Sequence, residues 1–119
     1  MVALLAEMSA HGLSVRDNVA GDPGCGQPSL RDNASRLTIQ LAGEPAAYTV
    51  FLFRWRRPAD FDAAAADFGA CVAEFSQVGT AVSTLEHSPW RAFGPNWSAA
   101  LEAALDDSLA GAAGGSQAD

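Results

Sequence analysis

The chain has 119 residues and a mass of 12.3 kDa, which is the size of a single domain. Apolar residues make up 49% and charged residues 18%, which supports a packed core and excludes collagen-like, disulfide-dense, transmembrane and wholly disordered classes. Seven arginines, no lysine and fourteen acidic residues give a net charge of −7 and a pI near 4.5, which argues against a nucleic-acid binder.

The charge is unevenly distributed along the chain. Residues 1–60 carry six arginines and six acidic residues, whereas residues 61–119 carry only Arg91 against eight acidic residues. All of the net charge therefore belongs to the second half. We expect the arginines of the first half either to pair with the acidic helix faces of the second or to hold an anionic ligand. The absence of lysine and the many Ala, Gly and Arg residues are typical of a GC-rich bacterial genome.

Hydrophobic periodicity predicts an α+β domain with the element order α-β-β-β-α-β-α. Apolar residues at helical spacing from Val2 onward predict a first helix, which Gly12 ends. The Gly- and Pro-rich segment 21–28 is expected to be a loop. Alternating and aromatic segments predict strands at 13–19, 36–41, 48–56 and 81–88.

Aromatic residues define the expected core. Alternate residues of the strand over 48–56 share one face, which carries Phe51, Phe53 and Trp55. The next helix, which Asp60 is expected to cap and Gly79 to end, has a stripe of phenylalanines at Phe61, Phe68 and Phe75. We expect an antiparallel sheet of about four strands to pack through its aromatic face against this helix. The first and last helices should flank or cover the remainder.

The last part of the chain is expected to hold a loop and a helix. Residues 89–95 combine Pro, Gly and aromatic residues and predict a loop. Asn96 or Ser98 should cap a last helix, which the glycines after residue 110 should end. The domain is therefore expected to span residues 1–110, and residues 111–119 to form a flexible tail.

The two cysteines are candidates for a disulfide, because Cys25 lies in the predicted loop and Cys71 on the apolar stripe of the helix. Such a closure would contribute about 4 kcal/mol in the loop-entropy model and would imply an oxidising compartment. The alternative is two free thiols, of which Cys71 would be a small buried apolar residue. A catalytic Cys25 would need a base beside it, and the spacing places neither His11 nor His87 there.

No catalytic residue, metal site or cofactor is predicted, because the spacings typical of zinc ligands, a P-loop, a dinucleotide fingerprint or a nucleophile elbow are absent. Asp60, Asp67 and Glu74 recur every seven residues. One helix spaces such residues about 10 Å apart along its axis, so they are expected to form a solvated helix edge and not a catalytic pair.

A candidate ligand site lies on the predicted sheet. If the strands over 36–41 and 48–56 form a hairpin, Arg36 falls opposite Arg54, on the face away from the aromatic core. Tyr48 and Arg56 share that face. Like charges opposite each other are unfavourable unless something anionic lies between them. The face is therefore predicted to bind a small anionic ligand or an acidic segment of a partner protein, since guanidinium groups bind carboxylates and phosphates. Alternatively, the first or last helix covers it and its own acidic residues pair with the arginines.

A resemblance rests on the order of four short segments: Leu4-Leu5-Ala6-Glu7 through Gly12-Leu13-Ser14-Val15, a Cys-bearing loop, the strand Val50-Phe51-Leu52-Phe53 and an Ala-rich helix. In this order the chain resembles small exported or lipoprotein-type domains of unknown function from high-GC bacteria. The resemblance implies a location in the cell envelope and no catalytic residues. The residues before Cys25 do not form a lipobox, and the N-terminal segment is not predicted to be an export signal.

The sequence thus predicts a non-catalytic interaction or small-ligand module, extracytoplasmic and without a transmembrane segment, with a cytoplasmic location left open. A first alternative is a small enzyme that uses His87 or Cys25 in a pocket between the Gly21–Gly26 loop and the Trp90–Trp97 loop. A second alternative is a structural domain that forms a homodimer across the open face of its sheet.

Overall fold

The structure of the chain is a computed structural model that describes residues 2–76 and 80–118. Within these ranges five strands form one sheet: β1 (Leu13–Ala20), β2 (Ala34–Leu41), β3 (Ala47–Arg54), β4 (Val82–His87) and β5 (Trp90–Pro95). The helices are α1 (Val2–Ala10), the 3-10 helix η1 (Pro28–Asn33), α2 (Pro58–Ala63), α3 (Ala65–Ser76) and α4 (Ala99–Ala118).

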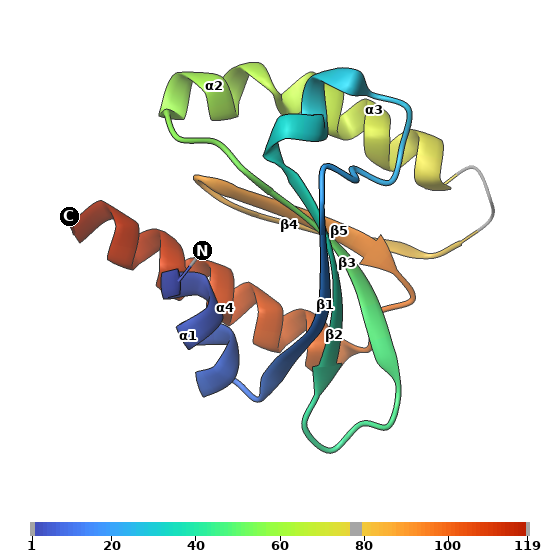
Figure 1. Cartoon of the computed structure of the whole chain (residues 1–119), viewed down its shortest axis with the longest axis vertical. Helices are drawn as coiled ribbons and strands as arrows, with labels where there is room; N and C mark the ends of the chain where they lie inside the picture. The colour runs from blue at the N-terminus through green and yellow to red at the C-terminus, as the bar shows by residue number, and fades with distance from the viewer. Residues whose placement is uncertain (1, 77–79, 119) are drawn as a thin grey trace.

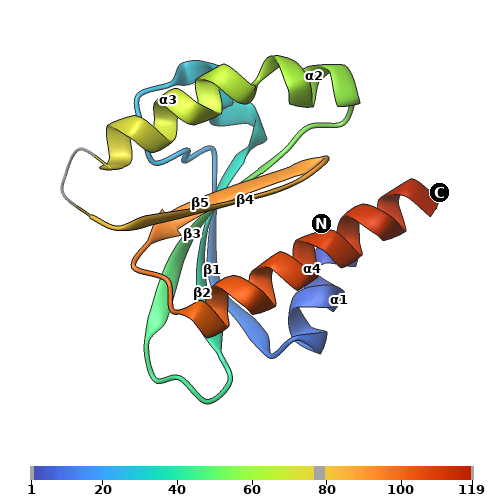
Figure 2. The same cartoon turned by 180° about the vertical axis from the view of Figure 1, so that it is seen from behind.

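The sheet is antiparallel throughout and its strand order is β1-β2-β3-β5-β4. It forms the middle of three layers, with α1 and α4 on one face and η1, α2 and α3 on the other (Figures 1 and 2). The predicted α+β class is confirmed, and the sheet has five strands where about four were expected.

The aromatic face of β3 packs against the helices that carry the phenylalanine stripe, as predicted. The ring of Phe68 meets that of Phe53 edge to face with centroids 5.4 Å apart, and Phe61 meets Trp55 in the same way at 5.9 Å. Pairs of this geometry add about 0.5–1.5 kcal/mol each to the burial of the rings. The aromatic core therefore attaches α2 and α3 firmly to the sheet.

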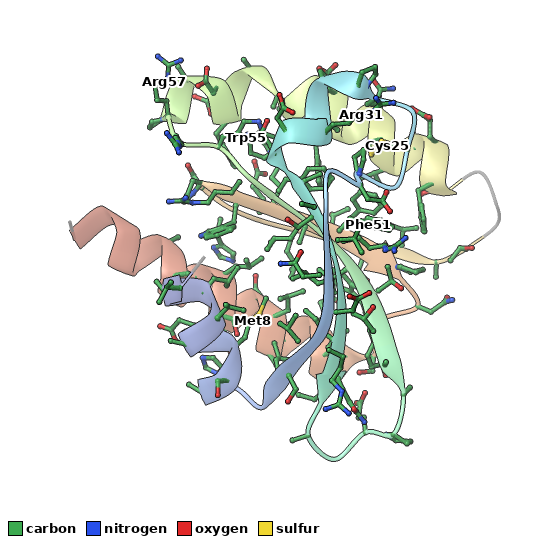
Figure 3. All side chains as sticks on the ribbon, in the orientation of Figure 1. Met8, Cys25, Arg31, Phe51, Trp55 and Arg57 are labelled. Carbon is green, nitrogen blue, oxygen red and sulfur yellow. A yellow bond between two sulfur atoms is a disulfide. The ribbon has the colours of Figure 1, made fainter. Side chains whose placement is uncertain are left out.

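A second, largely aliphatic core fills the other face of the sheet. Val50 and Leu52 of β3 lie under α1 and α4, which contribute Leu4, Met8, Leu101, Leu105 and Leu109. Figure 3 shows Met8 pointing from α1 toward the space between α4 and the sheet. The sheet face through which a homodimer was predicted is therefore covered by two helices.

The segment expected to be a loop before the last helix is instead the strand β5, and that prediction is wrong. This strand is buried from Trp90 to Gly94, because it lies between β3 and β4 and has helices over both faces. A Cβ atom on Gly94 would clash with the Thr49 carbonyl oxygen and the Trp97 indole. The glycine that favoured a loop thus permits close packing inside a sheet.

The helix that Asp60 was expected to cap begins three residues earlier than predicted. Pro58 is its first residue, and Arg57 is in the N-cap position without a capping hydrogen bond from its side chain. Asp60 lies in the first turn and pairs with Arg57 at 3.0 Å, so it does not cap the helix. The helix is also divided near Ala64 into α2 and α3. Its predicted end at Gly79 lies outside the described residues.

The last helix begins as predicted and is longer than predicted. Its N-cap is Ser98, whose Oγ accepts a hydrogen bond from the amide of Leu101 at 3.1 Å. It continues to Ala118, through most of the segment where a flexible tail was expected. Ala112 and Ala113 are buried in the core shared with α1. This packing outweighs the low helix propensity of the neighbouring glycines.

Candidate functional site

The structure does not bring the four residues of the predicted ligand face together. The β2–β3 register is displaced by three residues, so Arg36 lies opposite Phe51 and not opposite Arg54. An odd displacement moves a side chain to the other face of the sheet. Arg36 accordingly lies on the aromatic side, where it pairs with Asp22 at 2.9 Å.

Tyr48 and Arg54 do share a face of β3, but they lie at opposite ends of the strand, about 20 Å apart along an extended chain. The Tyr48 hydroxyl donates a hydrogen bond to Glu44 at 2.6 Å. The Arg54 guanidinium lies over the ring of Trp90, 5.4 Å from its centroid. Of the predicted set, only Arg54 and Arg56 therefore lie together.

These two residues border an open groove of about 1190 Å³, called here the arginine groove. It lies where β1 ends and β2 begins, and extends over η1, the segment after β3, α2 and the start of α3. Figure 3 labels Arg31, Trp55 and Arg57 on segments that border it. Its charged lining residues are Arg31, Asp32, Arg54, Arg56, Arg57, Asp60 and Asp67.

Local structure explains how the arginines reach the arginine groove. Trp55 is buried in the aromatic core and its amide donates a hydrogen bond to the Pro89 carbonyl oxygen at 3.1 Å. This anchor leaves Arg54 and Arg56, on either side of it in the sequence, exposed. The Asn33 side-chain amide donates to the Arg54 carbonyl oxygen at 2.8 Å, which joins η1 to the end of β3.

The arginines of the groove differ in their pairing. Arg57 pairs with Asp60. Arg31 and Arg56 are exposed, and no carboxylate of the described residues forms an ion pair with either. Of the groove arginines, Arg31 and Arg56 therefore make neither an ion pair nor, unlike Arg54, a cation–π contact with the described residues.

The predicted pairing between the two halves of the chain is not observed in the described part of the structure. Each arginine ion pair there joins residues of the same half: Arg36 with Asp22, Arg57 with Asp60, and Arg91 with Glu86. Pairing with acidic residues of the second half therefore does not account for Arg31 and Arg56.

The predicted disulfide is present, and it joins Cys25 to Cys71 of α3. The same side of α3 makes further contacts with the chain around Cys25. Asp67 accepts a hydrogen bond from the Ser29 hydroxyl at 2.7 Å. Glu74 accepts two, from the Gly26 amide at 3.1 Å and the Gln27 side chain at 2.6 Å. Asp67 and Glu74 thus hold residues 26–29, at the start of η1 and just before it, against α3, which a solvated helix edge would not do.

Acid should weaken this attachment. The hydrogen bonds from Gln27 and then from the Gly26 amide hold the pKa of Glu74 below its usual value. A carboxyl whose pKa is lower in the folded than in the unfolded state stabilises the fold at neutral pH, and this contribution is lost as the pH falls through the lowered pKa. In urea unfolding, Glu74→Gln should therefore be less stable than the wild type at neutral pH, and the difference should shrink in acid.

The control for this prediction is Asp107→Asn, because Asp107 is exposed on α4 and its side chain makes no hydrogen bond or ion pair with the described residues. It should show no such pH dependence. A Glu74→Gln deficit that stayed constant from neutral to acid pH would show that the carboxylate charge is not what holds the segment.

The groups of the predicted enzyme alternative do not meet. Cys25 is bonded to Cys71 and carries no thiol. The His87 Nε2 atom lies 2.6 Å from a carboxylate oxygen of Asp106, in a contact between β4 and α4. Neither His87 nor Cys25 lines the arginine groove, and no residue of β5 borders it.

Arg91 is a cation whose role the sequence pattern did not indicate. It is 4% exposed, and its guanidinium carbon lies 3.7 Å from the ring centroid of Phe61 and 5.3 Å from that of Trp55. It donates hydrogen bonds to the Phe61 carbonyl oxygen at 2.6 Å and to Glu86 at 2.9 Å. Arg91 is therefore part of the aromatic core and is not available to a ligand.

Two of the groove arginines, Arg31 and Arg57, were not in the predicted site. Arg31 lies on η1, which was not predicted within the segment after the Gly- and Pro-rich loop. The run Arg56-Arg57-Pro58 was a usable signal, since a proline is unfavourable within a sheet and two adjacent arginines favour an exposed position at the end of a strand.

None of the helices over residues 2–76 and 80–118 combines the length and apolar character needed to cross a membrane. The same ranges hold no group of three or more His, Cys, Asp or Glu side chains suited to a metal ion. Comparison of the chain with protein-family models, with curated proteins and with solved structures found no match.

Proposed function

We propose that this chain is a non-catalytic, extracytoplasmic binding domain that holds a small carboxylate- or phosphate-bearing molecule in the arginine groove. One observation carries the proposal: the unpaired Arg31 and Arg56 line the same open groove. Two like charges in one groove repel each other, and an anion between them removes that penalty. The planar guanidinium group can also donate two parallel hydrogen bonds to a carboxylate or phosphate.

The negative net charge of the protein favours a small anionic ligand over a large polyanion. The net charge of −7 repels nucleic acids and extended acidic chains at long range. Within the groove, Asp32, Asp60 and Asp67 lie near the arginines and would repel further negative charge. A compact ligand with its charge concentrated in one anionic group avoids both penalties.

The disulfide supports an extracytoplasmic location. Cysteine pairs persist in oxidising compartments and are kept reduced in most cytosols. The Cys25–Cys71 bond is therefore consistent with a chain that works in the envelope or outside the cell.

Calorimetric titration of the oxidised protein with citrate and with pyrophosphate, at an ionic strength of about 0.1 M, tests the proposal. Arg31→Gln and Arg56→Gln should each weaken binding at least about tenfold, since a hydrogen bond to a charged group contributes about 1.5–3 kcal/mol. The matched control is Arg16→Gln, which removes the same charge from an exposed, unpaired arginine of β1. Arg16 lies four residues before the groove residue Ala20, or about 13 Å along the strand.

The control should change the affinity less than about twofold once salt screens charges beyond about 10 Å. Binding of citrate alone assigns a carboxylate ligand, and binding of pyrophosphate alone assigns a phosphate. If neither anion bound, or if Arg16→Gln weakened binding as much as Arg56→Gln, the arginine groove would not be an anion site.

A further inference from the structure

The arginine groove has two walls that come from distant parts of the sequence. One wall, called here the loop wall, is the β1–β2 connection over residues 21–33, which contributes Arg31, Asp32 and Asn33. The other is formed by the end of β3, α2 and the start of α3. Figure 3 shows Cys25 on the loop wall beside α3.

We propose that the Cys25–Cys71 disulfide is a redox gate for this groove: the bond holds the loop wall in place for binding, and its reduction releases the wall and weakens the affinity for the anion. This inference rests on the proposed function. It concerns the one covalent bond between the two walls.

The other contacts between the loop wall and α3 are individually weak. Glu74 and Ser29 are exposed, so the hydrogen bonds of Glu74 with Gly26 and of Ser29 with Asp67 compete with water. The Cys71 sulfur lies 3.2 Å from the Pro23 carbonyl oxygen. Without the disulfide, residues 22–29 would therefore be held to α3 mainly by surface hydrogen bonds.

The rest of the domain does not depend on this attachment. The pairing of β1 with β2 extends to Ala20 and Ser35, and the Gly21 amide bonds to the Ala34 carbonyl oxygen at 2.9 Å. Leu30 of η1 is buried in the aromatic core and keeps the far end of the wall near the sheet. Reduction should therefore loosen residues 22–29 of the loop wall, directly before Leu30 and Arg31, while the sheet stays folded.

The two cysteines differ in solvent exposure, and this difference predicts which sulfur a thiol reductant attacks first. Cys71 is fully buried, whereas Cys25 is half-buried. A thiolate of a dithiol reductant would bond to the Cys25 sulfur, and the sulfur of Cys71 would leave with the electron pair and take up a proton. The second thiol of the reductant would then displace Cys25, so that two cysteine thiols and one oxidised reductant result.

Anion binding and disulfide reduction are thermodynamically linked, so the proposed gate can be measured through either of them. If reduction weakens anion binding by a given factor, the anion must oppose reduction by the same factor. A tenfold loss of affinity would therefore lower the reduction potential of the disulfide by about 30 mV when the anion saturates the groove.

The experiment compares three forms of the protein: oxidised, reduced by dithiothreitol, and Cys25→Ala/Cys71→Ala. Titration with the anion bound by the oxidised form should show about tenfold weaker affinity in the other two forms. Amide hydrogen exchange should speed up in residues 21–33, with the amides of β2 and β3 still protected. The anion should also shift the equilibrium of the wild type with dithiothreitol toward the disulfide.

Each failure has a distinct meaning. If the oxidised protein bound neither citrate nor pyrophosphate, the proposed function itself would fail. Equal affinity in the oxidised and reduced forms would overturn the gate and leave the binding site intact. Loss of protection throughout the sheet, in both the reduced protein and the double variant, would also overturn it, because the disulfide would then support the whole domain and not one wall.

Discussion

Arg91→Ala is expected to lower the free energy of unfolding by about 3 kcal/mol. The substitution removes a guanidinium group that is packed among the rings of Trp55, Phe61 and Phe68. It also leaves the Phe61 carbonyl oxygen without its 2.6 Å hydrogen bond and opens a cavity in the aromatic core. These losses act on the same buried site, and for a domain with a total stability of roughly 5–15 kcal/mol they are a large share.

Urea unfolding of Arg91→Ala and Glu86→Gln separates the contribution of the aromatic cage from that of the ion pair. The Glu86 side chain is 59% exposed, so water replaces most of its interaction with Arg91. Glu86→Gln should therefore lower the stability by less than about 1 kcal/mol. Equal losses in the two variants would show that the ion pair, and not the cage, holds Arg91.

Removal of the disulfide should have an effect of similar or larger size. The bond closes a segment with a sequence separation of 46, for which the loop-entropy model gives a stabilisation of about 4 kcal/mol. Cys25→Ala/Cys71→Ala should lose about this amount in denaturant unfolding, because its unfolded chain gains the freedom that the crosslink removes.

Reductant provides the control for this second prediction. Dithiothreitol should destabilise the wild type and leave Cys25→Ala/Cys71→Ala unchanged, since the variant has no bond to reduce. If the wild type were as stable in reductant as in its absence, with both thiols shown to be free, the crosslink would contribute nothing to the fold.

The central part of the fold could be predicted because its pattern is local. Alternation in β3 identified the face of Phe51, Phe53 and Trp55, and the seven-residue phenylalanine spacing identified the helix that covers it. The strand β5 was not predicted, because the features that make it a strand depend on tertiary packing. It is buried on both faces, so it shows no alternation, and Gly94 is required by the Trp97 indole above it.

The candidate site was predictable only in part, because the register of β2 with β3 decides which side chains lie together. Six of the seven arginines lie in the first half, and two residues of the predicted set, Arg54 and Arg56, line the groove. Pairing Arg36 with Arg54 required a register that the sequence pattern did not specify, and a displacement of three residues separated them. Arg31 joined the site through η1, which is anchored in the aromatic core by Leu30.

The most direct test of the anion site is an NMR titration of the oxidised protein that follows the arginine Nε–Hε signals during addition of citrate or pyrophosphate. The proposed function predicts saturable shifts of the Arg31 and Arg56 signals, while the signal of Arg16 stays in place. A spectrum in which no arginine signal moved, or in which Arg16 shifted as much as Arg31 and Arg56, would contradict it.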